Sequence, residues 1–182
     1  MTPQHVAHEV ATMDEMRAVV HGDDEATFRR LFEQHLDAVH RYCRRRARPE
    51  DADDAVAEVF LILWRRRHEV GSSADLPWLY ATARRVLANQ RRSLVRRMRL
   101  TDRLAREPVT VGRQQEPDDD IRDALTRLTE RDREVIRLAL WEDLAPGEIG
   151  QVLGCSAKAA SMRLSRALDR LSQRLSTQEI RR

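Results

Sequence analysis

The chain has 182 residues, of which 35% are charged and only 4% are aromatic, and its formal net charge is +3. All but one of its 33 basic residues are arginine, the exception being Lys158. This length suits two small helical domains. The composition argues against a membrane protein, because no apolar run approaches the roughly 20 residues that a spanning helix needs.

The two cysteines, Cys43 and Cys155, lie within apolar helical patterns. This placement indicates small buried thiols in a reducing compartment rather than a disulfide framework. The six histidines are scattered, and no Cys/His cluster has the spacing of metal ligands. There is no signal-peptide pattern. We therefore expect a cytoplasmic protein that is not an enzyme and that has no metal or cofactor.

Residues 1–22 predict an N-terminal extension with one short helix. Thr12 and Glu15 match a capping box, and Gly22 is expected to end the helix. Asp23 or Asp24 then caps a longer helix that stops before Pro49. Its inward face is predicted to hold Phe28, Leu31, Phe32, His35, Val39, Tyr42 and Cys43.

A third helix is predicted from Pro49, because a proline at the first helical position costs no hydrogen bond. One face is apolar, and the first turns and the opposite side are acidic, including Asp51, Asp54 and Glu58. Asp54 and Glu58 lie one turn apart and repel each other, so they give no local stability. A solvated acidic surface and a metal site are the alternatives, but a docking surface for a basic partner is the favoured interpretation.

The segment from His68 to Asp75 reads as a loop because of its Gly and Ser residues. Asp75 is expected to cap the next helix, whose inward residues are Leu79, Thr82, Ala83, Val86 and Leu87. Nine arginines and a single acid follow between Arg84 and Arg106. Several of these arginines share a helix side, which favours contact with a nucleic-acid backbone over a merely solvated basic surface.

Residues 101–120 are predicted to form a linker, since periodicity is lost and the segment "EPVTVGRQQEPDDD" contains two prolines and an acidic run. The sequence thus divides into two all-helical domains, residues 23–100 and 121–182, joined by a flexible acidic linker. In the second domain, Thr129 is expected to cap one helix and Pro146 to begin another.

The run "LAPGEIGQVLGCSAKAASMRLSRAL" has the outline of a helix-turn-helix. Gly154 interrupts the first helix, and Ser156 is expected to cap the second. The second helix has an apolar stripe made of Leu164, Ala167, Leu168, Leu171 and Leu175. Its other side is polar and basic, which suits phosphates and base edges in a DNA major groove, although a simple packing hairpin is the alternative.

Four stretches in this order make the chain similar to an ECF (extracytoplasmic-function) sigma factor of bacterial RNA polymerase. They are "DADDAVAEVFLILWR", "LPWLYATARRVLANQRR", "ALTRLTERDREVIRLALWEDLAPGEIGQVLGCS" and "MRLSRALDRL". The resemblance implies a protein that binds core RNA polymerase, recognises the −35 and −10 promoter elements and assists promoter melting. It further implies contacts with the β′ clamp helices and the β flap of the polymerase, with promoter DNA, and with an anti-sigma factor as a further partner.

The resemblance assigns roles to three sets of residues. Polymerase binding is expected from Asp51, Asp54 and Glu58. Recognition and melting of the −10 element are expected from Trp78, Arg84, Arg85, Asn89, Arg91, Arg92 and Arg96, together with the loop at residues 68–75, which captures a base flipped out of the DNA strand. Recognition of the −35 element is expected from Ser156, Lys158, Ala159, Ser161, Met162, Arg163, Ser165 and Arg166.

Two rival functions follow from the same residues. A helix-turn-helix regulator would bind duplex operator without polymerase, and its N-terminal domain would be a receiver with β-strands, of which residues 1–100 show no pattern. A helical metal-dependent hydrolase would need Asp51, Asp54 and Glu58 to be buried and convergent with further ligands.

Overall fold

The computed structural model describes residues 3–70, 75–101 and 124–179, with side chains described for residues 24–68, 75–96 and 124–176. All of the regular structure in these ranges is helical, which confirms the predicted all-α fold class. The helices are α1 (Pro3–Arg44), α2 (Pro49–Arg65), α3 (Arg67–Val70), α4 (Leu76–Thr101), α6 (Glu130–Leu140), α7 (Pro146–Leu153) and α8 (Ala157–Glu179). The predicted linker lies almost entirely outside the described residues.

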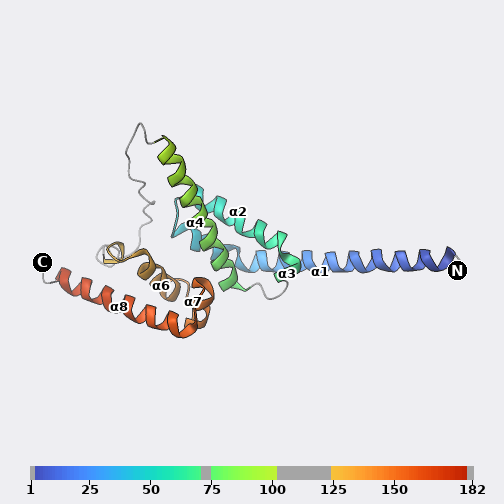
Figure 1. Cartoon of the computed structure of the whole chain (residues 1–182). Coiled ribbons are helices and arrows are strands. Elements are labelled where there is room, and N and C mark those ends of the chain that lie inside the picture. Colours follow the sequence, from blue (N-terminus) through green and yellow to red (C-terminus); the bar gives the residue numbers. More distant parts are fainter. Residues whose placement is uncertain (1–2, 71–74, 102–123, 180–182) are drawn as a thin grey trace.

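The prediction of a separate short helix that ends at Gly22 is wrong. Helix α1 runs without a break through this glycine, and Figure 1 shows its N-terminal part extending away from the other helices. A glycine inside a helix costs only about 1 kcal/mol relative to alanine. The residues on both sides of Gly22 continue the helix, so this cost is not enough to end it.

Helices α1, α2 and α4 pack together as the first helical unit. Pro49 begins α2 as predicted, and the apolar face of α2 is buried, with Ala52, Ala55, Val56, Val59, Phe60 and Leu63 in the core. Phe32 of α1 meets Phe60 of α2 edge to face, with ring centroids 4.8 Å apart. Such aromatic pairs add about 0.5–1.5 kcal/mol to the stabilisation from burial.

The segment between α2 and α4 is only partly a loop. His68 belongs to the short helix α3, which corrects the predicted loop at its start, whereas residues 71–74 lie outside the described residues. Asp75 caps α4 as predicted, because its Oδ1 accepts a hydrogen bond of 3.0 Å from the backbone N–H of Trp78. The five predicted inward residues of α4 are all buried.

The second unit consists of residues 124–128 with α6, α7 and α8, and its helix boundaries follow the predicted capping residues. Thr129 accepts a hydrogen bond from the backbone N–H of Asp132 and begins α6. Pro146 begins α7, and Ser156 accepts a hydrogen bond of 3.2 Å from the backbone N–H of Ala159 at the start of α8. On the predicted apolar stripe of α8, Leu168 departs from expectation with 38% of its surface exposed.

The two units are packed against each other. Helix α4 of the first unit contacts α7 of the second, and the buried apolar residues of both units form one continuous cluster. In Figure 1 the second unit, coloured orange to red, lies along one side of α4.

Candidate polymerase and nucleic-acid interfaces

The exposed face of α2 is acidic, and Asp53 on it lies 3.0 Å from the His40 ring nitrogen. Asp54 and Glu58 are exposed one turn apart, and within the described residues neither carboxylate has an ion pair or a hydrogen bond. Leu61 continues the same side of the helix with 45% of its surface exposed. Two unpaired acids beside an exposed leucine combine charge and apolar area, a combination that suits a protein partner.

Asp51 differs from the other two acids of this predicted set. Its carboxylate accepts hydrogen bonds of 2.7 and 3.2 Å from the guanidinium of Arg48, the residue before α2. It also lies in the first turn of the helix, where a negative charge is favoured by the helix dipole. Asp51 therefore has a structural role in the helix start.

The basic side of α4 faces away from its core. Arg84, Arg85, Asn89, Arg92 and Arg96 are exposed. Arg84 and Arg85 have no ion pair within the described residues, so their charge is available to an anionic ligand. Trp78 is half-buried, with the guanidinium of Arg66 at 5.9 Å from its ring.

Two further contacts involve the −10 set: Arg92 donates a hydrogen bond of 2.6 Å to the side-chain oxygen of Asn89, and Arg91 contacts the rest of the fold. The Arg91 guanidinium donates a hydrogen bond of 2.8 Å to the backbone carbonyl of Arg46, and it also pairs with the carboxylate of Glu130 in the second unit.

The turn between α7 and α8 is built around two glycines. Gly154 has a φ of 69°, a left-handed conformation that glycine adopts without strain. Gly150 lies under the turn, and a Cβ atom added there would come within 2.6 Å of the backbone carbonyl oxygen of Cys155. The close approach of these two backbones fixes the angle at which α8 leaves the turn, as in a helix-turn-helix.

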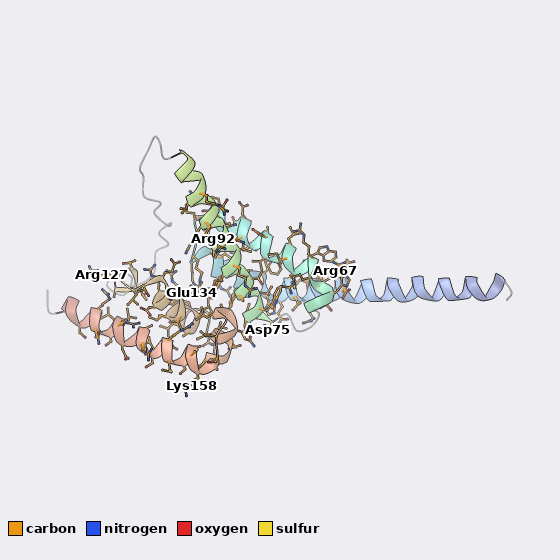
Figure 2. The ribbon with its side chains drawn as sticks, in the orientation of Figure 1. Arg67, Asp75, Arg92, Arg127, Glu134 and Lys158 are labelled. Carbon is orange, nitrogen blue, oxygen red and sulfur yellow. The ribbon has the colours of Figure 1, made fainter. Side chains whose placement is uncertain are left out.

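The predicted −35 residues lie on the outer side of α8. Lys158, Ser161, Met162, Arg163, Ser165 and Arg166 are exposed, and Ala159 is half-buried. Figure 2 shows Lys158 pointing away from the rest of the molecule. The Ser156 hydroxyl is used as the helix cap, so its contribution to the site is chiefly structural.

A groove of about 1190 Å³ lies between the two units, and it is lined by some members of both predicted DNA-binding sets. Its walls include Arg84, Arg85, Asn89, Arg91 and Arg92 from α4 and Arg163 and Arg166 from α8. The sequence predicted each basic surface separately. The position of these residues on one groove follows from the packing of the two units.

A cluster of charged residues that the sequence did not single out joins the two units. Arg46 is 4% exposed. Its Nε donates a hydrogen bond of 2.9 Å to Glu134 of α6, and its Nη1 donates one of 2.8 Å to Glu142, which follows α6. Figure 2 shows Glu134 between the two units. A basic run before Pro49 was visible in the sequence, but nothing there indicated its partners.

Aromatic and charged neighbours complete this cluster. The Tyr42 hydroxyl donates a hydrogen bond of 2.9 Å to Glu134, and the Arg46 guanidinium lies 3.6 Å from the centroid of the Tyr42 ring. Arg45 adds a hydrogen bond of 3.0 Å to Glu142. Tyr80 of α4 stacks on Tyr42, with ring centroids 4.7 Å apart.

The protonation of the cluster follows from its burial. Burial raises the pKa of Tyr42 well above its usual value, despite the opposing effect of Arg46, so this phenol stays neutral. Burial by itself lowers the pKa of Arg46, but Tyr42, Glu134 and Glu142 outweigh that effect and leave the pKa above its usual value. Arg46 is therefore a permanent buried cation that needs its two carboxylates.

No group of three or more His, Cys, Asp or Glu side chains within the described residues is arranged as a metal site. In the same ranges no helix is both long enough and apolar enough to cross a bilayer. Residues 3–70 are helical apart from the connections, which is incompatible with the receiver domain that the regulator alternative requires.

Comparison with protein families gives two matches. Residues 31–97 match the family described as Sigma-70 region 2, and residues 124–173 match Sigma-70, region 4, so that together they cover more than half of the chain. No curated protein matches the chain.

Two solved structures have the same fold at low sequence identity. The sigma factor RpoE from Bartonella quintana, in complex with the anti-sigma factor NepR, is 23% identical with a TM-score of 0.64; the match covers 82% of this chain and 96% of that one. CnrH in complex with the cytosolic domain of CnrY is 24% identical with a TM-score of 0.59, covering 82% and 88%.

The acidic helix, the basic helix and the helix-turn-helix thus coincide with the two matched regions. The chain belongs to the sigma-70 family, of which it contains region 2 and region 4, and it is a sigma factor that directs RNA polymerase to promoters.

Proposed function

We propose that this sigma factor divides its work among three surfaces. Asp54, Glu58 and Leu61 of α2 dock on the β′ clamp helices of core RNA polymerase. The basic side of α4 holds and helps to melt the −10 element, and the outer side of α8 reads the −35 element. We further propose that residues 23–100 and 121–182 act as separate domains on the polymerase, and that the second domain contacts the β flap.

The observation that supports the docking surface is the absence of internal partners for its acids. Like-charged carboxylates at i and i+4 destabilise a helix slightly. Asp54 and Glu58 keep this arrangement without a compensating ion pair in the described residues, and a basic partner would relieve it. The buried face of α2 is fully used by the core, so the exposed face is free for a partner.

The two DNA surfaces are supported by charge and exposure. Arg84, Arg85, Arg163 and Arg166 are exposed and have no ion pairs within the described side chains. Arginine is suited to this role, because its planar guanidinium makes paired hydrogen bonds with phosphate and with guanine. The proposed partners also include an anti-sigma factor, since both similar structures are of complexes and that of RpoE contains one.

Charge reversal tests the docking surface. We expect Asp54→Arg and Glu58→Arg each to weaken binding to core RNA polymerase at least about tenfold, because each reversal replaces an attraction with a basic partner by a repulsion. A tenfold loss of affinity corresponds to about 1.4 kcal/mol of binding free energy. The measurement is the dissociation constant of the purified chain with core polymerase at fixed salt.

Glu33→Arg is the matched control, since Glu33 is an exposed acid on α1 and lies outside all three surfaces. Circular dichroism should show the same helix content for all variants. If Asp54→Arg and Glu58→Arg both bind core polymerase as tightly as the control, the docking surface is wrongly assigned.

A further inference from the structure

We propose that Met162 is a specificity-determining residue of this sigma factor, and that its side chain contacts the C5-methyl group of a thymine in the −35 element. The inference rests on the proposed role of α8 in reading that element, and it adds the base pair that this position selects and the chemistry by which it does so. The thymine methyl group is the apolar feature that an A·T pair presents in the major groove.

Met162 lies in the middle of the exposed side of α8. At 3.6 residues per turn it is on the opposite side of the helix from Ala160 and Ala167, both of which have 0% of their surface exposed. The exposed fraction of Met162 itself is 46%. The packing of α8 in the core therefore does not require an apolar side chain at this position.

The neighbours of Met162 are polar or basic. Lys158 and Arg166 are exposed one turn before it and one turn after it, and Figure 2 shows Lys158 pointing away from the rest of the molecule. Cations at these two positions attract the phosphates along the groove. Ser161 and Ser165 are exposed beside Met162 and are shorter, so the methionine extends past them toward the bases.

The place of Met162 in the helix is what gives its exposure a meaning, since isolated apolar residues are common on protein surfaces. Met162 is the sixth residue of α8, which begins at Ala157. In helix-turn-helix proteins the N-terminal residues of the second helix are the ones that contact base edges. Apolar surface at this point leaves water when the helix enters the groove, and a base methyl group is the matching surface there.

The other residues at the start of α8 are less able to select an A·T pair. Asparagine and glutamine, which bind adenine through two hydrogen bonds, do not occur in residues 156–166. Serine hydroxyls bond to several bases, and arginine favours guanine. Ala159 is apolar, but it is half-buried and short. Selection of an A·T pair therefore depends on Met162.

The test uses the full-length chain bound to core RNA polymerase. Duplexes of random sequence, long enough for both promoter elements, are first selected for binding to this complex, which defines the upstream element. Each thymine of that element is then replaced singly by deoxyuridine, which pairs as thymine does but lacks the methyl group. We expect one replacement to weaken binding of the wild type by about threefold to fivefold at fixed salt, the effect of one buried methyl group.

Met162→Ala should remove this dependence, so that its complex binds the thymine and deoxyuridine duplexes equally. Met162→Leu keeps an apolar side chain and should restore the dependence. The matched control is Leu168→Ala, because Leu168 is also an exposed apolar residue of α8 but lies outside the −35 set; this variant should keep the full dependence. Circular dichroism should show the same helix content for all variants, since the substituted positions are exposed.

A wild type that is insensitive to deoxyuridine throughout the element would overturn the inference and leave the −35 role of α8 standing, as would an element of G·C pairs alone. An equal methyl dependence in Met162→Ala would also overturn it, because another residue would then make the contact. If the complex selects no upstream element, the proposed role of α8 is wrong and the inference fails with it.

Discussion

Cys43 lies beside Arg46 in the core of the first unit and has no exposed surface. Burial raises the pKa of its thiol to about 12, against an ordinary value of 9.0. Tyr80 is shifted in the same direction, because burial raises its pKa from 10.0 to about 12. Both groups are therefore neutral in the folded chain at physiological pH, and Cys43 is an inert packing residue rather than a reactive thiol.

These shifts predict a loss of stability in alkali. A folded-state pKa above the unfolded value means that the folded chain keeps a proton that the unfolded chain releases. The contribution of Cys43 is thus complete below about pH 9 and is lost as the pH rises toward 12. Urea denaturation at several pH values should show the free energy of unfolding falling from about pH 9.

Cys43→Ala isolates this effect. The variant should be less stable at every pH because it leaves a cavity, but its decline should begin nearer pH 10, where the tyrosines start to titrate. Identical slopes for the two proteins between pH 9 and 10 would show that the thiol does not contribute.

At the scale of an element, the helix-turn-helix depends on backbone contact. Gly150 is buried, and its carbonyl accepts a hydrogen bond of 2.9 Å from the backbone N–H of Cys155 across the turn. A side chain at Gly150 would strike the carbonyl of Cys155, which cannot move away as the end of a flexible side chain can. Gly147 in the first turn of α7 has open space instead.

Gly150→Ala should therefore destabilise the chain by about 1–3 kcal/mol, the usual effect of overpacking, even though alanine has the higher helix propensity. Gly147→Ala is the control and should be neutral. Thermal unfolding of the two variants decides the point, and a melting temperature for Gly150→Ala equal to that of Gly147→Ala would rule out a close-packed turn.

At the scale of the whole molecule, the two helical units share one continuous buried cluster as well as the charged contact. When an interface is large compared with the stability of its parts, the parts unfold together. The wild-type chain is expected to unfold in a single calorimetric transition. The Glu134→Gln/Glu142→Gln variant should give two, because it uncouples the units.

Scanning calorimetry of the free chain is the measurement, with Glu25→Gln/Glu33→Gln as the control that keeps one transition. Two separate transitions in the wild type would mean that the units are independent at equilibrium.

The sequence by itself determined most of the local structure and the character of each surface. Short-range backbone chemistry decides where several helices begin and end. Examples are the caps Thr129 and Ser156, the start of α2 at Pro49 and the turn at Gly154. Apolar periodicity likewise marks the faces that the core buries. The same periodicity predicts the exposed residues, because side chains that do not lie on the buried face of a helix must face solvent. It therefore also predicts the acidic exposed face of α2 and the basic sides of α4 and α8.

The tertiary structure decided how these surfaces lie relative to one another. Arg46 and Glu142 are 96 positions apart in the sequence. The local sequence around each of them does not distinguish it from an exposed arginine or glutamate. These two residues become buried only when the two units dock. The local sequence pattern of each unit carries no information about the other. The same long-range packing brings Arg84 and Arg85 of α4 onto one groove with Arg163 and Arg166 of α8, because the way two helical units meet is set by shape and charge across the interface and not by periodicity within a helix.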